Sequence, residues 1–354
     1  MMNLGPMKKI RTKNYNYNFF YETGLFIRWG KNLEENPPFS PLGPEILDVE
    51  VSTICHGING KPCSWCYKTN DPRGSNMSFE TFKKIFHKIP KNLTQIAFGI
   101  GDIDSNPELF KMFEYCRKND ENEVVPNVTI NGWNLTDKYA DKLARFCGAV
   151  AISNYKKDIT YNAVEKLAKR IGKNQNTLKQ VNIHQLTALE TFKDCITVTR
   201  DVKEDERLRG LNAIVFLALK QKGNRNTYHP LPLKKFREIV DYALSHKIAI
   251  GMDSCSAGKF LSCIKGHPHY KKFETLVEPC ESGLFSLYIN VYGRSYYCSF
   301  LEGEKGYSEF DVLNCTDFLK DVWYHPKMMI WRKKLLGTEK SNELKCRKCP
   351  QFRI

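Results

Sequence analysis

The stretch that decides the fold runs from a strand-like segment, Glu45-Ile-Leu-Asp-Val-Glu-Val-Ser-Thr-Ile54, directly into Cys55-His-Gly-Ile-Asn-Gly-Lys-Pro-Cys63-Ser-Trp65-Cys66-Tyr67. Apolar residues alternate through the first part, and this alternation predicts a β-strand. The three cysteines that follow are therefore expected on one loop at the end of that strand. A cluster of this kind is the strongest chemical signal in the chain.

Three thiolates on one loop can hold three irons of a cubane iron–sulfur cluster and leave the fourth iron open to another ligand. The chain has 13 cysteines, an odd number. The N-terminal residues Met1 to Lys13 lack the apolar core of a secretory signal, so we expect a cytoplasmic protein. In a reducing compartment, clustered cysteines bind metal more often than they form disulfides.

Composition places the chain among soluble globular proteins, with 42% hydrophobic and 26% charged residues. The apolar run at 213–219 is far too short to cross a bilayer. The formal net charge of +15 fits an anionic partner such as nucleic acid, a phosphorylated substrate or an acidic peptide. The basic residues are scattered in pairs, however, and this favours slightly an interpretation without any such ligand.

Strand-like and helix-like segments alternate through the middle of the chain, which predicts βαβ units and a mostly parallel sheet. Six repeats favour a partial (β/α)6 TIM-like barrel with its functional loops at the carboxyl ends of the strands. A flat, doubly wound sheet is the alternative. The predicted strands are 46–54, 94–99, 126–131, 148–153, 179–186, 211–219 and 247–252; the predicted helices are 78–89, 107–118, 136–146, 160–171, 188–207 and 232–246.

Three regions are expected. Residues 1–44 are rich in aromatic residues and proline, and we expect them to pack on the core as one or two strands. Residues 45–252 form the α/β core. In residues 253–354 the βα rhythm gives way to a small α+β domain, with a hairpin that turns at Gly293 and a helix at about 316–336.

At the cysteine loop the sequence resembles the radical S-adenosylmethionine (SAM) superfamily. That family usually has Cys-x3-Cys-x2-Cys, and this chain keeps Cys63-Ser-Trp65-Cys66 but places seven residues between Cys55 and Cys63. An enlarged loop costs little free energy. The resemblance implies a [4Fe–4S] cluster that binds SAM, reductive cleavage of SAM to a 5′-deoxyadenosyl radical, and hydrogen abstraction from a substrate.

The same resemblance suggests where SAM would bind. Gly99, Gly101 and Asp102 stand in the place of the family's Gly-Gly-Glu motif, which receives the SAM amino group, although a simple βα turn explains them as well. Further positions at strand ends would contact the ribose and carboxylate, or would be polar groups satisfied within a barrel mouth. Two aromatic residues of the loop would flank the adenine or only cover the cluster. These further residues are Asn131, Ser153, His184, Trp65 and Tyr67.

Four C-terminal cysteines resemble the twitch extension, a short relative of the SPASM extension found in some of these enzymes. The set is Cys280, Cys298, Cys346 and Cys349, with Gly293 between the first two. It implies a fully ligated auxiliary [4Fe–4S] cluster. A structural zinc ion held by the same cysteines is the alternative. A second zinc alternative joins Cys63 and Cys66 to Cys346 and Cys349, as in a zinc-binding module without enzymatic activity.

Asp253 and Cys255 follow the last expected strand of the barrel and are predicted to face the active site. Cys255 would return a hydrogen atom to a substrate radical, and Asp253 would act as a base in an oxidation. We expect an enzyme that modifies a peptide or protein, with a flavodoxin or ferredoxin as reductant. Modification of a nucleic acid or nucleotide, and dehydrogenation of a small molecule, are the alternatives.

Overall fold

The computed structural model describes residues 5–119, 122–173, 175–337 and 349–352. Its chain begins with a small antiparallel sheet of three strands, β1 (Met7–Arg11), β2 (Asn16–Phe20) and β3 (Phe26–Trp29). Tyr15, Tyr17 and Phe19 are buried against the rest of the protein. The aromatic N-terminal segment forms three strands, where the sequence predicted one or two, and its aromatic side chains are buried.

The main sheet has the order β10-β9-β8-β7-β6-β5-β4-β11-β12-β13. Strands β4 to β10 are all parallel, and β11 adds to β4 in parallel, while β12 and β13 are antiparallel. The parallel strands are β4 (Ile46–Glu50), β5 (Gln95–Gly99), β6 (Val125–Ile130), β7 (Ala149–Ser153), β8 (Gln180–Thr187), β9 (Ala213–Ala218), β10 (Ile250–Met252) and β11 (Ser286–Ile289).

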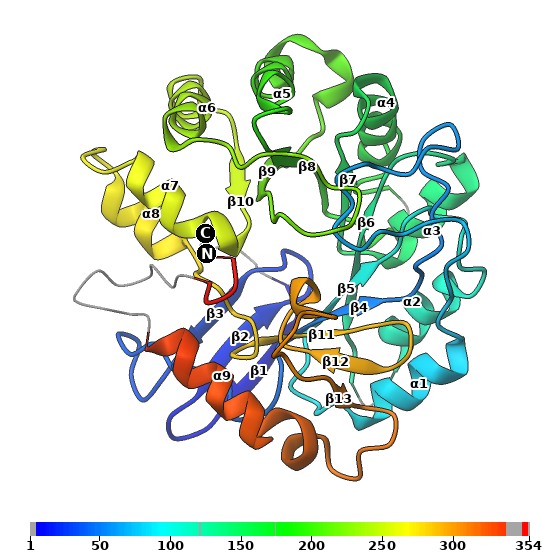
Figure 1. The fold of residues 1–354 in the computed structure, drawn as a ribbon, viewed down its shortest axis with the longest axis vertical. Helices are drawn as coiled ribbons and strands as arrows, with labels where there is room; N and C mark the ends of the chain where they lie inside the picture. The colour runs from blue at the N-terminus through cyan, green and yellow to red at the C-terminus, as the bar shows by residue number, and fades with distance from the viewer. Residues whose placement is uncertain (1–4, 120–121, 174, 338–348, 353–354) are drawn as a thin grey trace.

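Six helices connect the parallel strands and lie along the outer face of the curved sheet (Figure 1). Ser78 and Thr136 cap two of them through their side chains, as residues of this type do at helix N-termini. With these helices on one face only, the flat doubly wound alternative is wrong and the partial barrel is confirmed. The helices are α1 (Phe79–Lys88), α2 (Leu109–Lys118), α3 (Asp137–Phe146), α4 (Lys157–Ala168), α5 (Phe192–Glu204) and α6 (Leu233–Ser245).

The two faces of the sheet differ in chemistry. Side chains that point outward to the helices, such as Phe98, Ile130 and Ile183, are apolar and almost fully buried. The alternate positions, which include Asp48, Thr129 and His184, face the interior of the barrel and remain partly accessible. A polar inner face that stays partly open suits the binding of a ligand inside the barrel.

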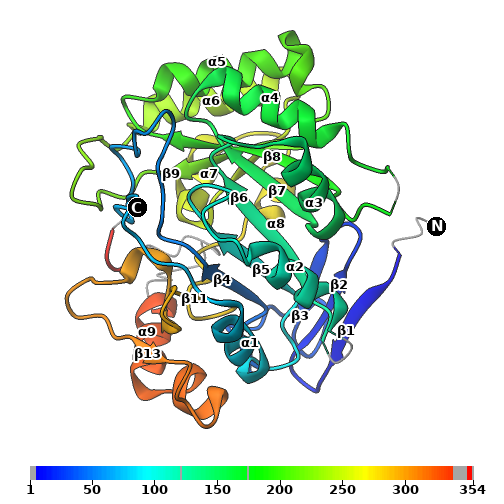
Figure 2. The ribbon, with the colours of Figure 1, turned by 90° about the vertical axis from the view of Figure 1, so that its right-hand side faces the viewer.

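The N-terminal sheet covers the end of the barrel where the parallel strands begin (Figure 2). The Tyr17 hydroxyl donates to the carbonyl of Asn92 at 2.5 Å, and the Lys8 ammonium donates to the carbonyl of Leu93 at 2.6 Å. Both carbonyls immediately precede β5. The carboxyl ends of the strands, where the cysteine loop lies, are therefore the open end.

The C-terminal part extends the main sheet. Its hairpin of β11 and β12 (Arg294–Tyr296) turns at Gly293 with φ of +72°, as the sequence indicated, and β13 (Phe310–Asp311) follows. The expected helix at 316–336 is instead a short π-helix at Leu319–Trp323 and a separate helix α9 (Pro326–Leu336). Pro326 explains the break, because proline suits a first helical turn and disrupts an interior one. Two short helices, α7 (Ala257–Cys263) and α8 (Tyr270–Leu276), were not predicted.

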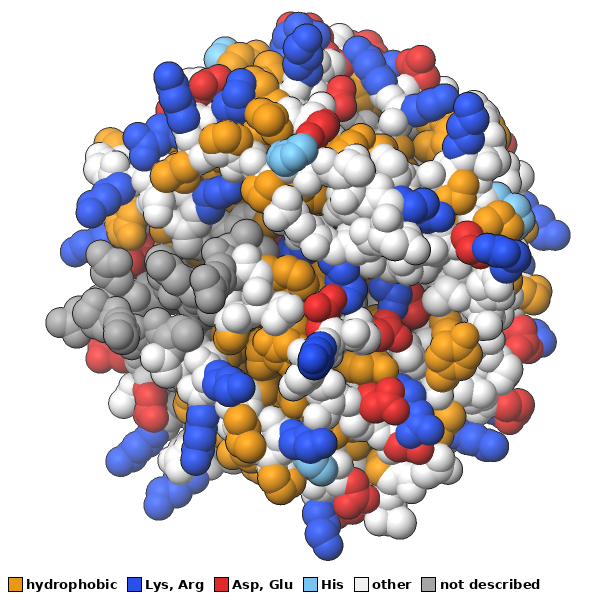
Figure 3. All heavy atoms as spheres, viewed as in Figure 1, with side chains coloured by type: hydrophobic (Ala, Val, Ile, Leu, Met, Phe, Trp, Pro, Cys, Tyr) orange, Lys and Arg blue, Asp and Glu red, His pale blue; other side chains and the backbone are white. Residues whose placement is uncertain are grey.

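Charged side chains of both signs are interspersed over the face shown in Figure 3, and the basic ones do not gather into one patch there. Within the described ranges, no helix combines the length and the apolar character needed to cross a bilayer.

A buried ion pair anchors the N-terminal sheet, and its loss should cost stability. The Arg28 guanidinium lies 2.7 Å from the Glu45 carboxylate, and both side chains are at most 7% exposed. We expect Glu45→Ala to lower the free energy of unfolding by about 3 kcal/mol, because the Arg28 charge stays buried with less compensation. Anaerobic urea unfolding measures the loss.

The matched control is Glu114→Ala, which removes an exposed pair with Lys118 at 2.6 Å. Its loss should be below about 1 kcal/mol. Equal losses in the two variants would contradict the anchoring role of Glu45.

Candidate iron–sulfur and SAM site

The cysteine loop leaves the carboxyl end of β4 and folds back on itself before Cys63. Asn59 and Gly60 both have positive φ, of 54° and 72°, and Lys61 N–H donates to the Ile58 carbonyl at 3.2 Å. This is the geometry that an Asn-Gly pair favours at the tip of a tight hairpin. The extra residues between Cys55 and Cys63 therefore form a compact hairpin that returns the chain toward Cys55.

The three thiols of the loop are close enough to influence one another. Burial, the Asp102 carboxylate, Cys63 and Cys66 together raise the pKa of Cys55 to about 12, and a hydrogen bond from the Gly57 N–H opposes them. Burial and then Cys66 raise the pKa of Cys63 to about 11. Thiols in such a site are neutral unless a bound cation compensates their charge. The donor set and its electrostatics fit a cationic metal group.

Gly101 lets the loop after β5 approach the first cysteine. A Cβ atom at this position would lie 2.6 Å from the Cys55 Cβ and 2.9 Å from its Sγ. At Gly99 the nearest atom would be 3.5 Å away, an ordinary contact. The structure therefore gives the two predicted glycines different roles, and only Gly101 is required by the packing of the cysteine loop.

Asp102 holds the cysteine loop against the barrel. Its carboxylate is 1% exposed and accepts hydrogen bonds from the His56 N–H at 2.6 Å and from the Asn131 side-chain amide at 2.7 Å. The Cys55 Sγ lies 3.8 Å from the same carboxylate. The structure thus brings Asp102 and Asn131 together, with contacts to each other and to the loop. Their predicted contacts with SAM stay a prediction.

Ser153 is the last residue of β7 and pairs with His184, which lies within β8. Burial lowers the pKa of His184 to about 4, so the imidazole is neutral at pH 7. Its Nδ1 is 3.5 Å from the Thr129 hydroxyl. A neutral imidazole can donate from one nitrogen and accept at the other, which suits recognition of hydroxyl groups. Their role in SAM binding remains a prediction.

The two aromatic residues of the loop point to different surroundings. Trp65 stacks on Tyr228 with ring centroids 4.9 Å apart and meets Tyr155 edge-on at 5.5 Å. Tyr67 packs on Phe300 at 4.3 Å. Trp65 therefore belongs to an aromatic cover formed with the loop after β9, whereas Tyr67 joins the cysteine loop to the C-terminal part.

Sequence reasoning missed a buried polar network beside Tyr67. The Lys68 ammonium lies 3.2 Å from the Glu50 carboxylate and 2.7 Å from the Tyr288 hydroxyl, and it also contacts Glu302. Asn290 donates to Glu302 at 2.7 Å. One sign of this network was present in the sequence: Glu50 lies at the end of a buried strand, where an acidic side chain needs a polar or charged partner.

Asp253 and Cys255 lie just after β10. The Asp253 carboxylate accepts hydrogen bonds from the Lys220 ammonium at 2.6 Å, the Ala218 N–H at 3.1 Å, and the Ser256 N–H and hydroxyl at 3.0 and 2.6 Å. Through these four hydrogen bonds, Asp253 caps the short helical turn that follows it. The predicted role as a base stays untested, and these contacts do not favour it.

The C-terminal cysteines that the structure describes are Cys280, Cys298 and Cys349. Burial raises the pKa of each of the first two, Cys298 to about 12, and neighbouring thiols add to the shift. Cys346 lies outside the described residues. Within the described ranges, no three His, Cys, Asp or Glu side chains are arranged around a single-ion site. A cluster spreads its thiolates over several irons, so it does not require that arrangement.

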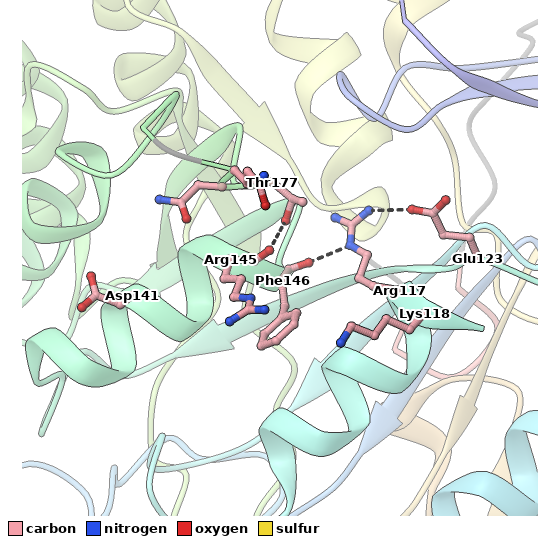
Figure 4. Close-up of a pocket in the computed structure, with 9 residues that line it drawn as sticks. Arg117, Lys118, Glu123, Asp141, Arg145, Phe146 and Thr177 are labelled. Carbon is pink, nitrogen blue, oxygen red and sulfur yellow. Dashed lines mark hydrogen bonds and ion pairs between the residues drawn. The ribbon is translucent and has the colours of Figure 1, made fainter. Parts of the chain in front are cut away.

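A surface groove lies at the other end of the barrel (Figure 4). Arg117 bonds there to the Phe146 carbonyl at 2.8 Å and lies 3.4 Å from Glu123. Its lining comes from the C-terminal ends of α2 and α3 and from segments that lead into β6 and β8. The groove is therefore separate from the cysteine loop, and two of its positive charges, Arg117 and Lys118, already have acidic or carbonyl partners.

Comparisons with known proteins support the fold. No protein-family model matches the chain, and no curated protein matches it in sequence. Solved structures do match. SuiB of Streptococcus suis, bound to S-adenosylmethionine, superposes with a TM-score of 0.61 at 13% identity, over 88% of this chain and 72% of that one. The structure of anSMEcpe with bound AdoMet and Cp18Cys peptide superposes with a TM-score of 0.59 at 16% identity, over 88% of this chain and 87% of that one. Both are radical SAM enzymes.

This chain has the radical SAM fold. The match confirms the partial barrel that the sequence predicted. In the radical SAM fold described here, the loop with Cys55, Cys63 and Cys66 lies at the open end of the barrel.

The close approach of Gly101 to Cys55 makes a sharp prediction. In Gly101→Ala the new methyl group would displace Cys55, so the iron bound by the loop and the reductive cleavage of SAM should both fall at least about tenfold. Gly99→Ala is the matched control and should retain both, because its methyl group meets only ordinary contacts. Iron analysis and 5′-deoxyadenosine formation measure the effect; equal loss in both variants would contradict it.

The buried carboxyl of Asp48 should make the free energy of unfolding depend on pH. Burial raises the pKa of this inner-face carboxyl to about 6, and among the described residues it has no hydrogen bond or ion pair. The native state thus binds the proton more tightly than the unfolded state, so unfolding free energy is lost as pH rises through about 6. Asp48→Asn should match the native chain near pH 4 and exceed it by about 2 kcal/mol at pH 7 in urea unfolding. A difference that does not vary with pH would contradict the assignment.

Proposed function

We propose that this protein is a radical SAM enzyme that generates a 5′-deoxyadenosyl radical and uses it to modify a peptide or protein. One observation carries the proposal. Cys55, Cys63 and Cys66 share a loop at the carboxyl end of the first parallel strand, and Gly101 and Asp102 pack directly against Cys55 and its neighbour. This supports a cluster-binding loop that opens toward the polar interior of the barrel.

The roles of the chain's own residues follow from their contacts. The three thiolates of the loop would hold the cluster, and Asp102 fixes the loop through His56 and Asn131. Trp65 and its aromatic neighbours exclude water from one side. The neutral His184 offers a hydrogen bond inside the barrel. When bound, the cluster supplies the electron that cleaves SAM.

The choice of a peptide or protein substrate is supported by two solved structures of similar fold. One shows SuiB of Streptococcus suis bound to the precursor peptide SuiA, with a TM-score of 0.62 at 13% identity, over 82% of this chain and 67% of that one. The other is the peptide-bound anSMEcpe described above. The rival proposal, modification of a nucleic acid or nucleotide, is favoured by the net charge of +15.

The proposal includes a second [4Fe–4S] cluster in the C-terminal part. The resemblance implied Cys280, Cys298, Cys346 and Cys349 as its ligands, and the mutual influence of the three described thiols supports such a site. A flavodoxin or ferredoxin would supply electrons, and a cytoplasmic location would keep the thiols reduced.

Anaerobic reconstitution tests the function. Protein supplied with iron, sulfide, SAM and dithionite should bind about eight irons per chain and form 5′-deoxyadenosine. Cys55→Ala, Cys63→Ala and Cys66→Ala should each abolish that product, and Cys116→Ala, which changes a fully buried thiol of α2, should retain it. Binding of one or two zinc ions without iron would refute the proposal.

The substrate class is tested separately. Peptides encoded beside the gene should change in mass when incubated with the reconstituted protein, SAM and dithionite. Strong, salt-dependent binding to generic DNA or RNA, without modification of any such peptide, would favour the nucleic-acid alternative instead.

A further inference from the structure

Cys255 was predicted to face the substrate as a hydrogen donor, and the structure places it among other thiols. It follows β10 by three residues, in the turn that Asp253 caps. The Lys220 ammonium, which lies 2.6 Å from Asp253, also hydrogen-bonds to the Cys255 thiol. Lys220 is only 5% exposed, so this contact lies inside the protein.

The same lysine contacts the turn that carries Cys298. Its ammonium lies 4.5 Å from the centre of the Phe300 ring, and Phe300 belongs to the short helical turn Ser299–Leu301 immediately after Cys298. Lys220 therefore joins the turns of Cys255 and Cys298, which are far apart in sequence.

The C-terminal segment reaches the same place. The Phe352 ring lies 6.2 Å from the Phe300 ring, and the Phe352 N–H donates to the Cys349 Sγ at 3.4 Å. Cys349 is thus held beside the turn that begins at Cys298. Three segments, one from the barrel and two from the C-terminal part, meet around Phe300.

The electrostatic influence of the thiols agrees with this geometry. After burial, Cys255 is the largest charged contributor that raises the pKa of Cys280, ahead of Cys298 and Cys349. It is also the largest charged contributor for Cys298, ahead of Cys349. This agrees with a position of Cys255 near Cys280 and Cys298, as the contacts of Lys220 already indicate.

Backbone N–H groups prepare two of these thiols for negative charge. The Ser282 N–H donates a hydrogen bond to the Cys280 sulfur, and the Phe300 N–H donates one to the Cys298 sulfur; each donor lies two residues after its cysteine. In the first loop, the Gly57 N–H donates to the Cys55 sulfur in the same way. The Cys255 sulfur has a hydrogen bond with the Lys220 ammonium instead. Hydrogen bonds to the sulfurs are among the features that tune iron–sulfur clusters.

We propose that Cys255 is a ligand of the auxiliary cluster, together with Cys280, Cys298 and Cys349. The inference rests on the proposed function for the existence of that cluster, but it changes the ligand set. A four-iron cluster takes four thiolates, and five cysteines are now candidates, so Cys346 becomes the surplus one. Cys255 then belongs to the auxiliary cluster, and the hydrogen-donor role falls away.

The experiment isolates the auxiliary site. In a background of Cys55→Ala, Cys63→Ala and Cys66→Ala, anaerobic reconstitution should leave about four irons per chain. Adding Cys255→Ala should reduce this to less than about one, or yield a three-iron cluster visible by electron paramagnetic resonance. Cys255→Ser, which keeps an oxygen ligand, should retain iron with an altered spectrum. Cys195→Ala, a buried thiol near the Leu186 carbonyl, should leave iron and spectrum unchanged.

Several results would overturn the inference. Full iron and an unchanged spectrum in Cys255→Ala would do so, as would loss of iron in Cys346→Ala but not in Cys255→Ala. A triple background without any iron would also overturn it. Circular dichroism of each variant separates loss of iron from loss of fold. The proposed SAM chemistry is judged independently, by 5′-deoxyadenosine formation in the chain with all its cysteines.

Discussion

The buried ammonium of Lys68 is the constraint on which the relation between the two cysteine sites depends. It lies two residues after Cys66 and contacts Glu50 on β4, Tyr288 on β11, and Glu302, four residues after Cys298. Breaking a buried charge cluster leaves uncompensated charge, so its members must keep their positions together. The packing of Tyr67 on Phe300 reinforces the same junction. The barrel and the C-terminal hairpin are consequently joined at this point, between the loop that carries Cys66 and the turn that follows Cys298.

The cysteine loop shows how a departure from the usual spacing can preserve geometry. The additional residues form a hairpin at Asn59 and Gly60, and its two ends return close together. Gly101 and Asp102 then fix Cys55 from the neighbouring strand end. Burial of the thiols makes an empty site unfavourable for negative charge, and a bound cationic group reverses that preference.

Most of the fold could be predicted from local sequence patterns. Alternating apolar residues and helix caps such as Ser78 determine the structure of the few residues around them. The hairpin at Gly293 was likewise predictable from its glycine. The Lys68 network was not, since it joins residues more than 200 positions apart through side chains with no local signature. The surroundings of Cys255 could not be read from the sequence for the same reason. Its place in sequence follows the last barrel strand, but Lys220 and Phe300, from distant segments, determine what surrounds it.

The N-terminal sheet has a consequence for the order of events. It covers the end of the barrel where the parallel strands start, through contacts such as that of Tyr17 with Asn92. If the proposed cofactor and substrate bind inside the barrel, the covered end is closed to them, and both would share the side on which the parallel strands end. The one that lies deeper would then have to bind before the other and leave after it.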